Sequence, residues 1–149
     1  MKTAACIICV AGLACAAAAD PVEPKTYTGQ GGPLADSSGG VPGLSTFSLN
    51  VPSDPDGTND IFSVVDVRLD INHTFVGDLI VRLRHNDTGT FATLIDRPGV
   101  PGPGNSDDLA GAYIFEDGQT PMPETAGGSG TVTPGVYGTA GPEFLFSFE

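Results

Sequence analysis

A strict alternation of apolar and polar residues from Val65 to Asn72 restricts the fold more than any other feature of the sequence. Apolar residues stand at every second position, and Asp, Arg or Asn fills the positions between them. Successive side chains of a β-strand point to opposite faces, so this pattern predicts a strand with one buried and one solvated face. A helix would mix the two sets of side chains. After a short connection, the run Leu79–Arg84 predicts a second strand of the same kind.

The outer faces of these two strands carry opposite charges. Asp66 and Asp70 are on the polar side of the first strand, and Arg82 and Arg84 are on the polar side of the second. If the two strands pair in an antiparallel manner, the acids and the arginines face each other, and each such pair contributes about 0.2–1 kcal/mol. We therefore expect an ionic cross-strand row that specifies the register.

Shorter segments with the composition of strands lie on both sides of this pair. They are the alternating residues Phe47, Leu49 and Val51, the run Thr90–Ile95 with either Ala92 and Leu94 or Phe91 and Ile95 inward, and the alternating Phe144, Phe146 and Phe148. Ala112–Phe115 is a short apolar piece. The chain has 21 Gly and 13 Pro among 149 residues, which favours short strands joined by turns over helices. We therefore expect an all-β, jelly-roll-like β-sandwich.

The N-terminus has the features of a secretory signal peptide. Lys2 gives it a positive start, an apolar run extends from Ala4 to Ala19, and small residues precede Asp20. The run is too short for a comfortable membrane span. A lipoprotein signal ending at Cys15 is the weaker alternative, because Gly12 stands where such signals carry leucine. We expect cleavage after Ala19 and a secreted or cell-surface protein.

This leader defines the domain organisation that we expect. Residues 1–19 form the signal peptide, residues 20–43 an irregular N-terminal lead or linker rich in Pro, Gly and Ser, and residues 44–149 the β-sandwich. The cysteines Cys6, Cys9 and Cys15 all lie in the leader. The processed chain therefore contains no disulfide, thiolate ligand or thiol nucleophile.

The charge of the chain excludes some classes of partner. Its formal net charge is −12, and processing removes one lysine and no acid. Such a surface repels nucleic acid and anionic lipid, so we expect neither nucleic acid nor a membrane as a partner of the processed chain. It attracts divalent cations, although a solubilising surface explains it equally well.

The segment "VDVRLDINHTFVGDLIVRLRHNDTGTFATLIDRPG" at residues 65–99, followed by "GNSDDLAG", resembles the P domain (Homo B domain) of kexin- and furin-like proprotein convertases. The most specific part is His73–Leu79 between two alternating strands, with Gly89-Thr90 in the next turn. The resemblance covers roughly residues 36 to 149. It implies a non-catalytic module that packs on a subtilisin-like catalytic domain, or on another secreted protein, and stabilises it.

Members of that family continue with strands that contain tryptophan, whereas this chain has none. The resemblance therefore implies either a fragment or a sandwich that lacks its last strands. Proteins with this domain are associated with serine-type endopeptidases and proteolysis. A serine protease nevertheless needs a nucleophile, a base and an orienting acid, and only His73 and His85 could serve as the base. No serine elbow is present, so we expect no enzyme activity and a structural role for His73.

Calcium is the cofactor that the sequence favours, because it takes six to eight oxygen ligands from loop carboxylates and carbonyls. By resemblance to calcium-binding P domains of bacterial hydrolases, we expect Asp78, Asp107, Asp108 and Asp117 to form the site. The alternative is that Asp78 caps a turn while Asp107 and Asp108 are solvated. A weaker second candidate is the set Asp54, Asp56, Thr58 and Asp60, which has the spacing of part of an EF-type loop without its final Glu.

Two functions remain open from the sequence. The first is the accessory, stabilising module of a secreted endopeptidase. The alternative is a calcium-dependent cell-surface or carbohydrate-binding jelly roll. Sugars usually stack on aromatic side chains, and the chain offers only Tyr27, Tyr113 and Tyr137 in addition to phenylalanines, the last two tyrosines in expected loops.

Overall fold

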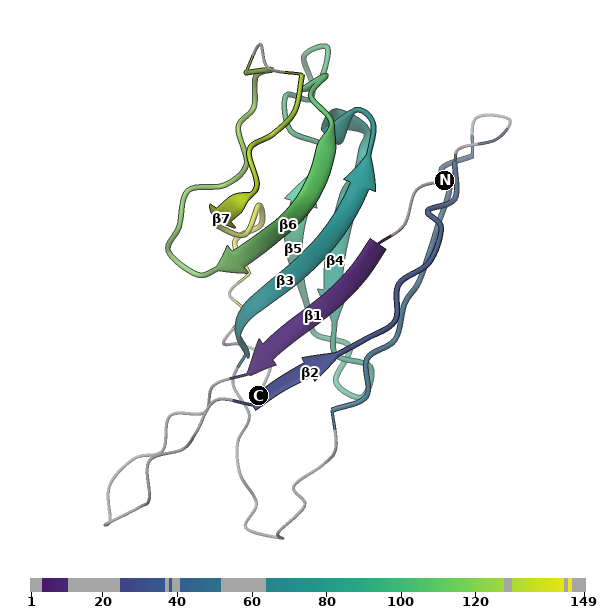
Figure 1. The fold of residues 1–149 in the computed structure, drawn as a ribbon, viewed down its shortest axis with the longest axis vertical. Coiled ribbons are helices and arrows are strands. Elements are labelled where there is room, and N and C mark those ends of the chain that lie inside the picture. Colours follow the sequence, from purple (N-terminus) through teal and green to yellow (C-terminus); the bar gives the residue numbers. More distant parts are fainter. Residues whose placement is uncertain are drawn as a thin grey trace, which may run out of the picture.

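The computed structural model describes residues 4–10, 25–36, 38, 41–51, 64–127, 130–143 and 145. The described residues form seven strands in two sheets and one turn of 3-10 helix (Figure 1). The elements are β1 (Ala4–Val10), β2 (Lys25–Thr28), β3 (Val64–His73), η1 (Val76–Asp78), β4 (Ile80–Arg84), β5 (Phe91–Asp96), β6 (Leu109–Glu116) and β7 (Gly135–Tyr137). The expected all-β class is confirmed.

The larger sheet has five strands in the order β2-β1-β3-β6-β7 (Figure 1). Its longest ladder pairs β3 with β6 in an antiparallel manner, from Asp66 opposite Glu116 to His73 opposite Leu109. On the other side of β3 lies β1, which belongs to the predicted leader, and β1 pairs in turn with β2, which belongs to the predicted linker. The short β7 is parallel to β6.

The smaller sheet contains β4 and β5, and its register shifts between Val81 and Arg82. Val81 lies opposite Ile95 and Arg82 opposite Thr93, so Leu94 is an extra residue in β5. A bulge of this kind interrupts the alternation of faces. The structure therefore buries Ala92, Leu94 and Ile95, a combination of the two expected sets, and leaves Phe91 41% exposed.

The ionic row expected between β3 and β4 is wrong, because these strands belong to different sheets. The chain leaves β3 through Phe75, which has left-handed backbone angles, and then enters η1. The N–H groups of Val76 and Gly77 donate to the carbonyls of Asp107 and Asn105. These bonds hold the connection across the end of the molecule, so that β4 begins in the second sheet instead of folding back beside β3.

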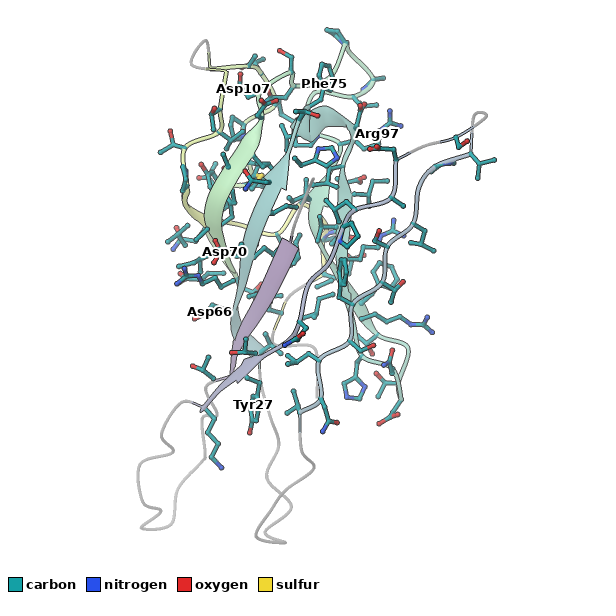
Figure 2. The ribbon with its side chains drawn as sticks, turned by 45° about the vertical axis from the view of Figure 1, so that its right-hand side comes forward. Tyr27, Asp66, Asp70, Phe75, Arg97 and Asp107 are labelled. Carbon is teal, nitrogen blue, oxygen red and sulfur yellow. The ribbon has the colours of Figure 1, made fainter. Side chains whose placement is uncertain are left out.

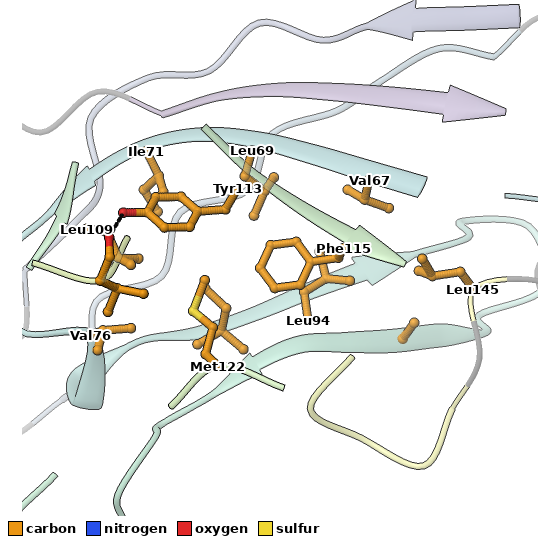
Figure 3. Close-up of a cluster of buried hydrophobic side chains, with 13 residues drawn as sticks. Val67, Leu69, Ile71, Val76, Leu94, Leu109, Tyr113, Phe115, Met122 and Leu145 are labelled. Atoms are coloured by element: carbon orange, nitrogen blue, oxygen red, sulfur yellow. Dashed lines mark hydrogen bonds between the residues drawn. The ribbon is translucent and has the colours of Figure 1, made fainter. Parts of the chain in front are cut away.

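Side chains from both sheets share one hydrophobic core (Figure 3). From the larger sheet they come from β3 and β6, which alternate inward as the sequence predicts for β3, and from the smaller sheet they come from β5. Met122, Val132 and Leu145 join them from the loops and the C-terminal region. The fully buried members with the largest side chains are Tyr113, Phe115, Leu94, Ile95, Leu109 and Leu145.

The segment around Phe47, Leu49 and Val51 is not a strand in the structure. It belongs to an arm, residues 29–36, 38 and 41–51, which leaves β2, turns at a bridge between Ser38 and Val41 and returns along itself (Figure 1). Leu49 packs against the core, but Phe47 and Val51 are each 37% exposed. The predicted final strand, Phe144 to Phe148, lies outside the described residues except for Leu145.

Candidate functional site

Three connections meet at the end of the molecule where β3 finishes and β6 begins. They are residues 74–79 between β3 and β4, residues 97–108 between β5 and β6, and the first part of the segment between β6 and β7. Phe75 and Asp107 lie together at this end, and Tyr27 lies at the opposite end (Figure 2). We call this region the loop end.

Asn105 is fully buried at the centre of the loop end. Its Nδ2 donates to the Pro123 carbonyl at 2.8 Å, and its Oδ1 accepts the Asp107 N–H at 2.9 Å. Its main-chain N–H donates to the Pro98 carbonyl, and its own carbonyl accepts from Gly77. The side chain and peptide groups of Asn105 thus connect all three segments. Each of these polar groups has a hydrogen-bond partner, as is usual for buried polar groups in folded proteins.

The carboxylates of Asp107 and Asp108 also hold these loops in place. Asp107 is 3% exposed, and its Oδ2 accepts the Gly127 N–H at 2.6 Å. Asp108 Oδ1 accepts the Phe75 N–H at 3.1 Å. Charge-assisted bonds to backbone N–H groups are among the stronger hydrogen bonds in proteins. Both acids therefore act as loop anchors, a role that differs from the solvated pair considered in the sequence.

Glycines allow the loop backbones to approach each other closely. A Cβ on Gly77 would lie 2.7 Å from the Asn105 nitrogen, and a Cβ on Gly99 would lie 2.5 Å from the Glu124 carbonyl oxygen. Gly99 also has a φ of 84°, and its N–H donates to the Glu124 carboxylate. No other residue type fits these positions without a shift of the main chain.

Phe75 presents an aromatic ring from a strained backbone. Its φ of 68° and ψ of 79° are unusual for a bulky residue, and its side chain is 36% exposed. Arg97, at the start of the neighbouring loop, also has a positive φ, of 44°. Non-glycine residues in such conformations cost about 1–3 kcal/mol each and cluster at functional sites. The strain at Phe75 thus points to the loop end as the functional part of the molecule.

Beside Phe75 the loops enclose an open hollow of about 650 Å³. Its walls are mostly apolar and come from Phe75, from the β5–β6 loop, which includes Val100, Pro101 and Pro103, and from residues 124–126. Val100 is 41% exposed, and both prolines are also exposed. Glu124 supplies the one carboxylate of this wall, and that carboxylate is already bonded to the Gly99 N–H.

The predicted calcium ligands are only partly brought together. Asp78, Asp107 and Asp108 lie at the loop end, whereas Asp117 follows the last residue of β6 at the opposite end of that strand. Eight strand residues at about 3.3 Å each separate Asp117 from Asp108, so it cannot share an ion with the others. Asp117 Oδ1 instead accepts the Leu145 N–H at 2.9 Å.

Within the described part of the chain there is no group of three or more His, Cys, Asp or Glu residues that could hold a metal ion. The second candidate set, Asp54, Asp56, Thr58 and Asp60, lies outside the described residues. Calcium binding therefore stays a prediction, and the described residues Asp78, Asp107 and Asp108 do not form such a group in this structure.

The tyrosines do not form a stacking platform. Tyr113, expected in a loop, lies in β6 and is fully buried, with its hydroxyl donating to the Val132 carbonyl at 2.8 Å. Tyr137 lies in β7, where its hydroxyl donates to the Thr133 carbonyl at 2.6 Å. The expected loop positions of both are wrong, because residues on either side of Tyr113 extend into a full ladder with β3. Tyr27 lies in β2.

The two histidines lie at separate places in the fold. His73 is the last residue of β3, and His85 stands at the turn between β4 and β5, where its Nδ1 lies 3.2 Å from the Thr88 nitrogen. The Thr88 hydroxyl oxygen lies 3.0 Å from His85 Nδ1 as well. His85 thus closes its own turn and does not face His73 across a common site.

On the outer face of the larger sheet, like charges face each other. Asp66 and Glu116 are direct cross-strand partners in β3 and β6. Burial raises the pKa of the Asp66 carboxyl above its ordinary value, and the Glu116 carboxylate raises it further. Asp70, on the same face of β3, instead forms an ion pair with Arg68 at 3.4 Å. The carboxylates of Asp66 and Glu116 therefore repel each other on this face. Among the described residues no ion pair joins Asp66 to a cation.

The chain is an all-β protein with two sheets around a common core. Comparison with protein-family models, with curated proteins and with solved structures finds no match. Among the described residues no helix has the length and apolar character needed to cross a membrane.

Proposed function

We propose that the chain is a secreted, non-catalytic accessory domain of the P-domain type, with a jelly-roll-like sandwich fold, and that its loop end docks on a partner polypeptide and stabilises it. One observation carries this proposal. Phe75, Val100, Pro101 and Pro103 expose apolar surface beside one hollow, on loops that the buried side chains of Asn105 and Asp107 hold in place.

The energetics of this arrangement favour binding over a purely structural role. Exposed apolar side chains and a strained Phe75 do not stabilise the isolated domain. They become favourable when a second surface covers them, and loops that are already ordered lose little entropy in that step. An aromatic ring at the centre of such a surface is a typical anchor of a protein interface.

A subtilisin-like catalytic domain is the partner class that we favour. The support is the resemblance of residues 65–99 to convertase P domains, together with a crossing between sheets at His73–Asp78, where the most specific part of that resemblance lies. The alternative of a calcium-dependent carbohydrate-binding module has less support, because Tyr113 is buried and Tyr137 bonds to the main chain.

Titration calorimetry tests this function directly. The processed chain is titrated into a convertase-type catalytic domain that lacks its own P domain, and Phe75→Asn is compared with the parent. Asn tolerates left-handed backbone angles, so this change removes the ring without adding strain. We expect Phe75→Asn to weaken binding about tenfold or more, as for an interface anchor.

Phe91→Asn is the matched control, because Phe91 is an exposed aromatic of similar accessibility on β5, where Arg82 lies over its ring at 5.4 Å. We expect this variant to bind within about twofold of the parent. Failure of the parent to bind, or loss of binding in Phe91→Asn alone, would contradict the proposed docking surface.

A further inference from the structure

The strand β1, which lies between β2 and β3 in the larger sheet, belongs to the predicted leader. β1 pairs with β3 from Ala4 opposite Ile71 to Val10 opposite Val64, and it separates β3 from β2. Cleavage after Ala19 removes this strand, so β3 loses its partner on that side and exposes a row of unpaired backbone groups. Such an edge is prone to pair with any extended segment nearby.

We propose that residues 44–51 take the place of β1 beside β3 once the leader has been removed. The leader would then act as a temporary strand that closes the sheet in the precursor, and the mature sheet would be completed by the chain itself. This inference rests on the predicted cleavage site and is independent of docking at the loop end.

The direction of the chain favours this exchange. β2 is antiparallel to β1, and the first limb of the arm, residues 29–36, continues from β2 (Figure 1). The second limb returns antiparallel to the first, with Gly43 against Ala35 and the Phe47 ring against Gly32. Residues 44–51 therefore run in the same direction as β1, which is antiparallel to β3. They need no reversal to pair with it.

The pattern and position of this segment also fit the place beside β3. Phe47, Leu49 and Val51 alternate with Ser48 and Asn50, as a strand with one buried face requires. Leu49 already packs against the core that the buried face of β3 helps to form.

The arm leaves apolar surface exposed that a strand could bury. Phe47 and Val51, which share the inward face of the proposed strand with Leu49, are each 37% exposed while β1 is present. In the proposed strand the side chains of Phe47 and Val51 would lie beside the buried side chains of β3. The exchange thus covers apolar area that the precursor leaves in water.

Three registers keep apolar side chains on the core face of β3, and the one with Leu49 opposite Ile71 would place residues 44–46 beyond His73, where β3 ends. Two registers therefore remain. Val67, Leu69 and Ile71 are the buried residues of β3. If Leu49 lies opposite Leu69, then Asn50 lies opposite Arg68; if Leu49 lies opposite Val67, then Ser48 does. Since residues 52–63 connect the two segments covalently, the pairing is intramolecular, and its effective concentration of roughly millimolar exceeds that of a second copy.

Disulfide trapping in the exported protein tests the exchange. The full chain is expressed in an exporting host as Ser48→Cys with Arg68→Cys and as Asn50→Cys with Arg68→Cys. Directly opposite residues in an antiparallel pair have Cα atoms about 4.5–5.5 Å apart, within disulfide range. With a strand between them the separation is at least about 9.5 Å, which no disulfide spans. The control pairs Ser48→Cys with Thr88→Cys, which lies in the turn between β4 and β5.

We expect the intact mass of a chain that begins at Asp20. One of the two test pairs should form a disulfide within the monomer, and the control pair should form none. Hydrogen exchange of the processed parent chain should show protected amides in residues 46–51 together with those of β3 and β6. Retention of the leader, absence of a cross-link in both test pairs, a cross-link found only as a covalent dimer, or unprotected β3 and β6 amides would each overturn the exchange.

Discussion

Asn105 shows how much of the loop end depends on one buried polar side chain. Its amide donates to Pro123 and accepts from Asp107, and no solvent reaches it. Nothing in the local sequence singles out this Asn, because its role depends on which loops meet around it. The acids Asp107 and Asp108, by contrast, were predicted as site residues, and the structure places them at the loop end as acceptors of backbone N–H groups.

Replacing Asn105 by Ala should lower the free energy of unfolding by about 1–3 kcal/mol, because the buried Asp107 N–H and the partly buried Pro123 carbonyl lose their partner. Urea denaturation followed by circular dichroism measures the change. Asn86→Ala in the exposed turn after β4 is the control and should stay within about 0.5 kcal/mol of the parent. Equal stability of the two variants would show that Asn105 does not hold the loops.

Asp66 gives the fold a dependence on pH. Its pKa in the folded state is raised above the ordinary value of 3.8 by burial and by Glu116. The ionised carboxylate therefore destabilises the fold at neutral pH, and this penalty disappears as the pH falls through the raised pKa toward 3.8.

Asp66→Asn should accordingly raise the free energy of unfolding at pH 7 by about 0.2–1 kcal/mol, the range for one cross-strand charge pair. The gain should shrink as the pH falls through the raised pKa and vanish by about pH 3, below the ordinary value of 3.8. Denaturation curves at both pH values provide the measurement, and Asp70→Asn, which removes a partner of Arg68, should give no gain at either. A gain that persists in acid would exclude the charge as its cause.

At the scale of elements, the sequence predicted the strands that have a long alternation of apolar and polar residues. It did not predict how those strands pair. Val65–Asn72 and Leu79–Arg84 correspond to β3 and β4 within a residue or two at each end. Their assignment to different sheets depends on the αL backbone of Phe75 and on bonds to Asn105 and Asp107, which are distant in sequence. Periodicity carries no information on such contacts.

The turn η1, which connects β3 to β4 in the second sheet, should be destabilised by a single added methyl group. Gly77→Ala places a Cβ 2.7 Å from the Asn105 nitrogen, so η1 or the loop must move. We expect a loss of about 1–3 kcal/mol in the free energy of unfolding, typical of overpacking.

Gly135→Ala in β7 is the matched control, because a Cβ there meets no atom within 4 Å. It should leave stability unchanged or slightly higher, since alanine is less flexible than glycine in the unfolded chain. The two variants can be compared in one thermal melt. A tolerated Gly77→Ala would show that the crossing is not held by this backbone contact.

At the scale of the whole molecule, the core explains both what the sequence could predict and what it could not. The inward residues of β3 were evident from their spacing, whereas Met122 and Val132 stand alone in a stretch rich in Pro, Gly and Thr and gave no pattern. Tyr113 was misplaced for the same reason, because Gly111 and Ala112 beside it weaken the alternation of β6. Composition predicted the all-β class, and only the assembled fold shows which loops lie together.

The central claim is that this molecule stabilises a partner and performs no chemistry itself. The most direct test is the half-life of a convertase-type catalytic domain at elevated temperature, measured by peptide hydrolysis with and without an equimolar amount of the processed chain. We predict that the chain alone hydrolyses nothing, that it lengthens the half-life of the catalytic domain, and that Phe75→Asn does not. Hydrolysis by the chain alone, or an unchanged half-life with the parent chain, would contradict the account.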